Sequence, residues 1–116
     1  MDDWRRWFSP GVTYLAIDDN DDAVGLVVGF VSQEPGVADL MSMWVHPNNR
    51  GTGVGDDLVR ALVAWSEAEH RRLRLHVVDG NAPAIALYQR HGFRVTGDIT
   101  VRENGVHELE MARTAT

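Results

Sequence analysis

The sequence of 116 residues predicts one mixed α/β (α+β) domain, a sheet of about six strands with helices on its faces. Six short segments are rich in β-branched residues, and two longer segments repeat apolar residues every three or four positions. They follow the order ββ-β-α-β-α-β-β, which is typical of a mixed sheet. A chain of this length with 44% hydrophobic residues can form one core without disulfides, so we predict a single domain over residues 1–116.

The first two predicted strands, residues 12–17 and 23–32, form a hairpin. Residues 18–22, Asp-Asp-Asn-Asp-Asp, lie between them and have the polar composition of a turn. Their alternating oxygen atoms resemble the start of a calcium-binding loop, which requires glycine at its sixth position and glutamate at its twelfth. Ala23 and Gly29 occupy those positions, so we interpret the segment as a turn and predict no metal there.

A glycine-rich turn, Arg-Gly-Thr-Gly-Val-Gly at residues 50–55, follows the third predicted strand at residues 39–45. It opens the first predicted helix, so its N–H groups converge at the positive end of the helix dipole, a geometry that binds phosphate oxygens. The turn is neither the dinucleotide fingerprint nor a P-loop. Taken alone, it is equally compatible with a flexible connection between strand and helix.

The two predicted helices differ in how the sequence marks them. The first covers residues 56–70, where Leu58 and Leu62 belong to an apolar stripe at helical spacing. The second begins at the N-cap Asn81 and ends before Gly92, a residue suited to a helix C-terminus. The remaining strands are predicted at residues 73–78, 93–96 and 106–113, and a short helical turn at residues 1–8.

Composition and charge restrict the possible functions. The formal net charge is −6, all 11 basic residues are arginine, and there is no cysteine. Lysine Schiff bases, disulfides and cysteine nucleophiles are therefore excluded. An acidic chain without a basic stripe argues against a nucleic-acid partner, and the longest apolar stretch is too short for a bilayer, so we expect a cytoplasmic protein without membrane contact. Residues 1–57 hold ten acidic residues and three arginines, a balance of −7 that suits a cationic partner.

Two separate motifs carry a family resemblance. Arg50, Gly53 and Gly55 fill the fixed positions of a pyrophosphate-binding motif, Gln/Arg-x-x-Gly-x-Gly/Ala. The later pattern Asn-x-x-Ala-x-x-Leu-Tyr-x-x-x-Gly-Phe is matched by Asn81, Ala84, Leu87, Tyr88, Gly92 and Phe93. In this order the two motifs resemble the GNAT superfamily of N-acetyltransferases. The resemblance implies the GNAT fold, acetyl-CoA as donor, and direct transfer of the acetyl group to a primary amine, either a small molecule or a peptide.

The resemblance also implies how the chain holds acetyl-CoA. Backbone amides of the glycine-rich turn would cradle the pyrophosphate, Trp44 and Val45 would pair with the pantetheine arm, and Asn81 would add a polar contact. The turn residues assigned to this role are Arg50, Gly51, Thr52, Gly53, Val54, Gly55 and Asp56. No metal is implied, because the five histidines show no paired ligand spacing.

Two residues are predicted to be catalytic. Tyr88 matches the tyrosine that many relatives use to protonate the departing thiolate, although it could simply pack on the sheet or touch the cofactor. Asp39 begins the strand on which several relatives place a glutamate base, although an aspartate at a strand start is often only solvated. His46 is the rival base, or a turn residue. Regular alternation would place Asp39 on one face with Met41, Met43 and Val45.

The start of the chain departs from the family pattern. The family's N-terminal strand and first helix, which help build the acceptor site, have no counterpart before the first predicted strand. We expect one of two explanations for Trp4, Trp7 and Phe8. Either they are a remnant of the family's second helix, or the true start of the protein lies upstream of this sequence. An exposed edge or apolar face would result, so we expect a homodimer. The alternative to an enzyme is a non-catalytic module of the same fold that binds or senses acyl-CoA.

Overall fold

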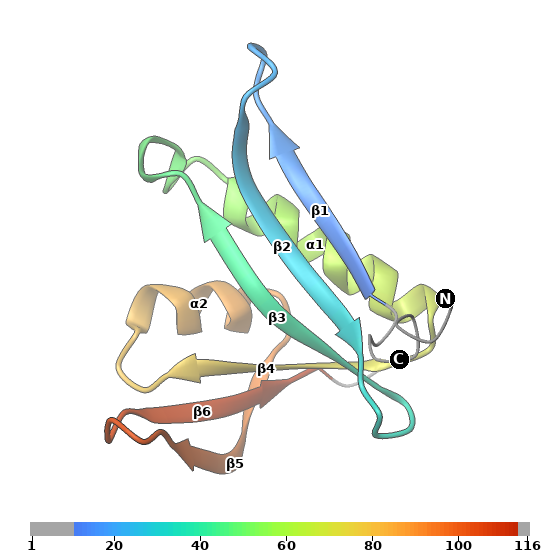
Figure 1. The fold of residues 1–116 in the computed structure, drawn as a ribbon, viewed down its shortest axis with the longest axis vertical. Coiled ribbons are helices and arrows are strands. Elements are labelled where there is room, and N and C mark those ends of the chain that lie inside the picture. The colour runs from blue at the N-terminus through green and yellow to red at the C-terminus, as the bar shows by residue number, and fades with distance from the viewer. Residues whose placement is uncertain (1–10, 114–116) are drawn as a thin grey trace, which may run out of the picture.

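A computed structural model describes residues 11–113, which form a six-stranded sheet with two helices (Figure 1). The strand order is β1-β2-β3-β4-β6-β5, and within these residues the pairing of β3 with β4 is the single parallel one. The predicted mixed α/β architecture is therefore confirmed. The helical turn predicted at residues 1–8 lies outside the described residues. The strands are β1 (Gly11–Ile17), β2 (Ala23–Val31), β3 (Val37–Val45), β4 (Arg72–Val78), β5 (Arg94–Val101) and β6 (His107–Ala112).

The acidic segment between β1 and β2 is a turn, as predicted. The Oδ1 atom of Asp18 accepts hydrogen bonds from the N–H groups of Asn20 and Asp22, each at 2.9 Å. Asp21 has a φ of 65°, a conformation that aspartate tolerates better than most residues. The carboxylate of Asp18 thus stabilises the turn itself.

Both helices, α1 (Val54–Ala68) and α2 (Ala82–Arg90), cover the same face of the sheet. Leu58, Val59 and Leu62 of α1 are buried against the strands. Gly29 of β2 allows this approach, because a Cβ atom there would lie 2.6 Å from Leu62 Cδ1. Within residues 11–113, no helix is long and apolar enough to cross a membrane.

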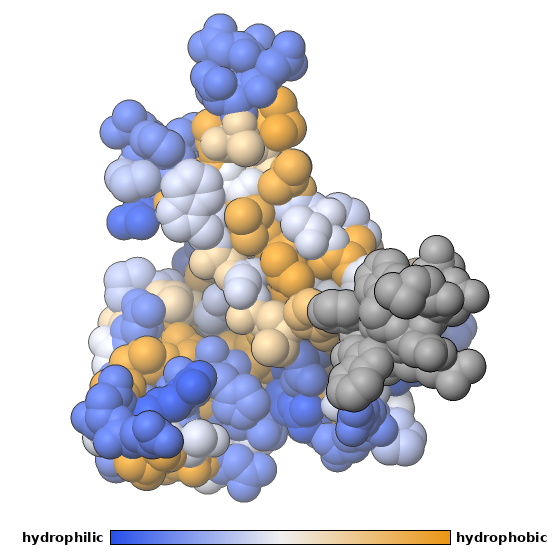
Figure 2. Space-filling model, in the orientation of Figure 1, coloured by the Kyte–Doolittle hydropathy of each residue, from blue (hydrophilic) through white to orange (hydrophobic). Residues whose placement is uncertain are grey.

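The opposite face of the sheet carries no helix among residues 11–113. Figure 2 shows apolar side chains gathered over β1 and β2 on this face. Leu15 and Ile17 of β1 are both more than half exposed there, although they are apolar. The sheet is therefore covered by helices on one side only in the described part of the chain.

The strands β3 and β4 pair over only part of their length. Residues 37–40 pair with residues 72–75, whereas β3 continues to Val45 and β4 to Val78. Beyond Leu40 the two strands diverge, as Figure 1 shows. Within residues 11–113, the backbone edges that face each other across this gap have no strand partners.

An extra residue in β3 changes which side chains share a face. Gly29 pairs with Leu40 and Val28 with Ser42, so Met41 has no partner in β2. Such a bulge shifts the alternation by one residue. Leu40 therefore packs on the helix side, as do Met43 and Val45, and Asp39 lies on the other face. The prediction that Asp39, Met41, Met43 and Val45 share a face is wrong for this reason.

Candidate active site

A cleft of about 1020 Å³ occupies the gap between β3 and β4. Its walls are residues 40–45 of β3, residues 76–78 of β4, the glycine-rich turn, α2 and Glu108 of β6. Val77 of β4 is buried on the helix side and His76 is exposed on the other side, yet both line the cleft. The cleft therefore connects the two faces of the sheet.

The glycine-rich turn lines this cleft and contains several free N–H groups. Gly51 and Gly53 have φ angles of 78° and 95°, and a Cβ atom on either would meet nothing within 4 Å. The first hydrogen bond of α1 runs from the Asp57 N–H to the Gly53 carbonyl, at 3.0 Å. Among residues 11–113, no carbonyl accepts from the N–H groups of Gly51, Gly53, Val54, Gly55 or Asp56. Free amides at a helix N-terminus form a site for phosphate oxygens.

Two side chains of the predicted cofactor set stabilise the turn from within. The Thr52 N–H donates to the Asn49 carbonyl at 3.4 Å, and its hydroxyl donates to the same carbonyl. The Arg50 Nε donates to the Val45 carbonyl at 3.2 Å, which ties the turn to the end of β3. Arg50 lines the cleft, whereas the Thr52 amide is already engaged in a hydrogen bond.

Trp44, Val45 and Asn81 of the predicted cofactor set all line the cleft. Asn81 is the N-cap of α2, and its Oδ1 accepts from the Ala84 N–H at 3.4 Å. His46 is not among the residues that line the cleft. Its Nδ1 accepts from the Asn48 N–H at 3.1 Å, which caps the short 3₁₀ helix η2 (Pro47–Asn49) and makes His46 a turn residue.

Asp56 lies in the first turn of α1, where its carboxylate would oppose a bound anion. His91 Nε2 lies 2.8 Å from Asp56 Oδ1, and the Arg90 guanidinium lies 3.1 Å from the same oxygen. The hydrogen bond with His91 is the largest of the contacts that lower the pKa of Asp56. The pair of basic side chains compensates the charge of Asp56 and joins the start of α1 to the end of α2.

Tyr88 reaches the cleft from α2 on the helix side. It is 8% exposed, and its ring packs edge-on against Phe93 with centroids 5.7 Å apart. Its hydroxyl lies 3.9 Å from Met43 Sδ, a weak acceptor. Burial raises the pKa of Tyr88, so the phenol keeps its proton at neutral pH and can donate it. The geometry therefore allows both the packing role and the acid role.

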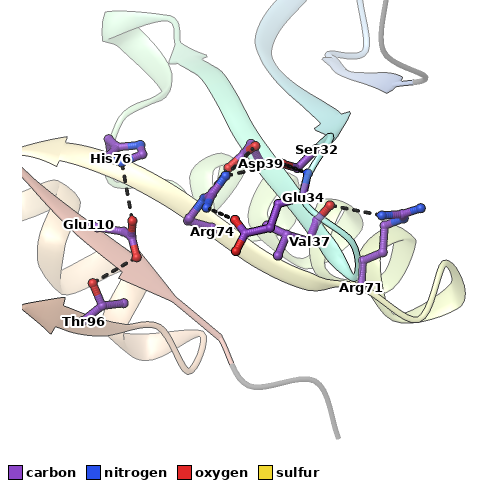
Figure 3. A network of polar contacts seen from close by, with 9 residues as sticks. All are labelled: Ser32, Glu34, Val37, Asp39, Arg71, Arg74, His76, Thr96 and Glu110. Carbon is purple, nitrogen blue, oxygen red and sulfur yellow. Dashed lines mark hydrogen bonds and ion pairs between the residues drawn. The ribbon is translucent and has the colours of Figure 1, made fainter. Parts of the chain in front are cut away.

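Asp39 is not among the residues that line the cleft. Its two carboxylate oxygens accept from Arg74, with distances of 2.7 Å from Nε and 3.2 Å from Nη2 (Figure 3). Arg74 also pairs with Glu34 at 2.7 Å, and these contacts, Asp39 first, raise the pKa of Arg74. Asp39 thus anchors the closed end of the gap between β3 and β4.

Sequence reasoning assigned no site role to Met43, His76 or Glu108, which are among the residues that line the cleft. His76 lies opposite Glu110 of β6 and contacts its carboxylate (Figure 3). The alternation of β4 was the available signal, since it places His76 on the face opposite the buried Leu75 and Val77.

Comparisons with known proteins agree with this architecture. The family model "Acetyltransferase (GNAT) family" matches residues 1–93. An uncharacterized N-acetyltransferase of Schizosaccharomyces pombe is 30% identical over 94 residues, which are 79% of this chain and 58% of the relative. Mycothiol acetyltransferase of Clavibacter sepedonicus is 35% identical over 93 residues, which are 78% of this chain and 29% of the relative.

Among solved structures, nourseothricin acetyltransferase superposes with a TM-score of 0.82 and 28% identity, covering 91% of this chain and 66% of that one. The chain therefore spans less than two thirds of each of these three relatives. The matched family model extends over most of the sequence, including both motifs up to Phe93. The chain belongs to the GNAT acetyltransferase family.

Proposed function

We propose that the chain is an acetyl-CoA-dependent N-acetyltransferase that moves the acetyl group directly to a primary amine. The observation that carries this proposal is the cleft that joins the free amides of Gly51, Gly53, Gly55 and Asp56 to a buried, protonated tyrosine. The family uses acetyl-CoA. A thioester already activates the acetyl group, so the chain has to supply binding, orientation and proton transfer.

The donor would lie along the cleft, between the glycine-rich turn and Tyr88. The free amides of the turn and the Arg50 side chain favour a pyrophosphate at one end. The unpaired edge of β3 at Trp44 and Val45 offers backbone groups to an amide-containing arm, as in the addition of a strand to a sheet. Asn81 and the amide of Asp56 complete the proposed set. The Thr52 amide would have to give up its hydrogen bond to the Asn49 carbonyl in order to bind the donor.

Tyr88 is proposed as the acid that protonates the leaving thiolate. Its hydroxyl lies beside Met43 and has no strong acceptor in the described part of the chain, so it is available to the sulfur atom of a bound donor. Asp39 was the base predicted from the sequence, but its contacts with Arg74 do not support that role. The proposed acceptor is a cationic amine, in keeping with the acidic first half of the chain.

We also propose that the chain forms a homodimer. Val95, Ile99 and Val101 of the edge strand β5 are between 46% and 60% exposed, and Leu15 and Ile17 are exposed on the helix-free face. Unprotected edges and apolar faces favour association with a second copy. Sedimentation equilibrium should give a mass near twice 12.9 kDa, and a strictly monomeric chain would contradict the proposal.

The decisive experiment replaces Tyr88 by phenylalanine and follows thiol release from acetyl-CoA over a panel of amines. The change removes only the hydroxyl, so the fold should persist while turnover falls by roughly 10²–10⁴. The KM for acetyl-CoA should change much less, because the loss falls on the transition state. Tyr14→Phe is the matched control, since Tyr14 is the other tyrosine and packs on the core from β1.

The alternatives give different results in the same assay. If the Tyr88 hydroxyl only binds the donor, KM should rise while turnover at saturation persists. Full turnover in Tyr88→Phe would refute the acid role. Tight binding of acetyl-CoA by the wild-type chain without thiol release to any amine would favour the non-catalytic binding module.

A further inference from the structure

A chain of three polar side chains on the helix-free face leads from β5 to the cleft (Figure 3). Thr96 Oγ1 donates a hydrogen bond to Glu110 Oε1 at 3.0 Å. The other carboxylate oxygen, Glu110 Oε2, lies 3.8 Å from His76 Nε2. His76 is the member that lines the cleft, so the chain ends with an imidazole at the cleft wall.

The Glu110 carboxylate is more shielded from solvent than the imidazole that it contacts. The Glu110 side chain is 17% exposed and the His76 side chain is 40% exposed. A shielded carboxylate next to an accessible imidazole orients the ring. A base placed in this way can accept a proton from a substrate and release it to water.

We propose that His76 is the general base that deprotonates the acceptor amine, with Glu110 and Thr96 as the residues that position it. This inference rests on the proposed acetyltransferase function and names its acceptor subsite. Tyr88 reaches the cleft from the helix side and His76 from the other side. The acid and the base therefore reach the cleft from opposite faces of the sheet, and the amine enters from the helix-free face.

The proton transfers balance with these two residues. His76 takes one proton from the ammonium group, which leaves a lone pair on nitrogen to attack the acetyl carbonyl carbon. The carbon–nitrogen bond forms and the carbon–sulfur bond breaks, and Tyr88 gives its proton to sulfur. The nitrogen then loses its second proton, which restores Tyr88, and the proton on His76 passes to water. One proton is released for each acetyl group transferred.

The charged groups near His76 make this assignment more consistent than the one to Asp39. Glu110 of β6 is the acidic residue directly opposite His76. Glu108, the other nearby acidic residue of β6, is already paired with Arg102 at 3.0 Å. Arg74, two residues before His76, directs its charge to Asp39 and Glu34. His76 thus faces a carboxylate and the open cleft, whereas Asp39 faces a guanidinium and does not line the cleft.

The test compares His76→Gln with His107→Gln, an exposed histidine of β6 that does not line the cleft. Two acceptors are used, an alanine peptide with an α-amine of pKa about 8 and spermidine, an alkyl amine whose pKa is about 10. His76→Gln should lower kcat/KM by roughly 10²–10⁴ and remove the acid limb of the pH profile between pH 5 and 8. The fall in kcat/KM should be larger for spermidine than for the alanine peptide. At neutral pH a smaller fraction of the spermidine amine is deprotonated, so its reaction depends more on a base. His107→Gln should behave as the wild type.

The positioning role of Glu110 has its own signature. Glu110→Gln keeps the hydrogen bond to Thr96 and removes the negative charge beside the imidazole. The fall in kcat/KM should be smaller than in His76→Gln, and it should be larger for spermidine than for the alanine peptide, as it is in His76→Gln. A purely structural role would lower kcat/KM equally for the two acceptors. The proposal is overturned if His76→Gln keeps the wild-type profile, or if Asp39→Asn removes the acid limb instead.

Failure of the proposed function gives a different result. A wild-type chain that acetylates neither the alanine peptide nor spermidine would contradict the transferase proposal. The acceptor subsite at His76 would then be tested by the NMR signal of its imidazole ring. The C2 proton resonance of His76, assigned by its loss in His76→Gln, should shift when spermidine is added in the presence of acetyl-CoA. An unchanged resonance would overturn the acceptor subsite.

Discussion

Gly53 contributes two features to the glycine-rich turn, a left-handed backbone conformation and a free amide. Its φ of 95° lies in the left-handed region, it is the N-cap of α1, and its N–H points to no protein carbonyl in the described residues. Gly53→Ala should weaken binding of acetyl-CoA tenfold or more, about 1.4 kcal/mol, because the added methyl group strains the turn and obstructs close approach of an anion. Isothermal titration calorimetry measures this directly.

Gly105→Ala provides a matched control for that measurement. Gly105 has a φ of 83° and no neighbour within 4 Å of a Cβ atom, so a methyl group there strains the backbone in the same left-handed region as at Gly53. Both variants should unfold at a lower temperature, but only Gly53→Ala should lose affinity. Unchanged affinity in a folded Gly53→Ala variant would remove the turn from the donor site.

Residues within local motifs could be assigned from the sequence, and residues paired across the sheet could not. The glycine-rich turn and Asn81 follow from short patterns whose backbone consequences are local. The partner of Asp39 is Arg74, 35 residues later, and no periodicity predicts that contact. His76 belongs to no motif, and its importance appears only once β4 is seen to line a cleft beside β6.

At the scale of elements, the ionic contacts of Asp56 connect the N-terminus of α1 to the C-terminus of α2. Because the pKa of Asp56 is lowered in the folded chain, the ionised carboxylate stabilises the fold at pH values above its ordinary pKa of 3.8. That contribution is lost as the pH falls through the lower, folded pKa. Asp56→Asn should therefore reduce the unfolding temperature above pH 4, and the difference from wild type should shrink at more acidic pH.

Asp57→Asn is the control on the same helical turn. Asp57 pairs with Arg60 at 2.8 Å, but both side chains are largely exposed, and such pairs contribute little to stability. Its effect on the unfolding temperature should be small at every pH. Equal effects of the two substitutions in thermal melts from pH 2.5 to 7 would show that Asp56 does not link the helices.

The order and type of the elements could be predicted from periodicity, but the faces of β3 and the end of β5 could not. The bulge at Met41 arises from the pairing of β3 with β2, so strand alternation read from β3 alone gave the wrong face for Asp39. The strand β5 continues to Val101, beyond the predicted end at residue 96, and all of its residues are exposed. An exposed edge strand has no buried face and therefore shows no alternating pattern.

The whole molecule carries a formal net charge of −6, and the excess of acidic residues lies in its first half. This field should favour cationic acceptors, so kcat/KM should be higher for spermidine than for a glutamate-rich peptide amine. The preference should weaken between 0.05 M and 1 M NaCl, because the screening length falls to about 3 Å at 1 M salt. Highest activity with the acidic amine, with no dependence on salt, would contradict selection by charge.

The short contact between β3 and β4 divides the sheet into two three-stranded plates that share only four residue pairs. A donor that hydrogen-bonds to both free edges would act as an additional cross-link between the plates. By mass action, a ligand that binds only the folded chain adds about 2.7 kcal/mol to its stability at a concentration of 100 Kd. The supply of acetyl-CoA in a cell would then set how long each molecule survives proteolysis, as well as how fast it works.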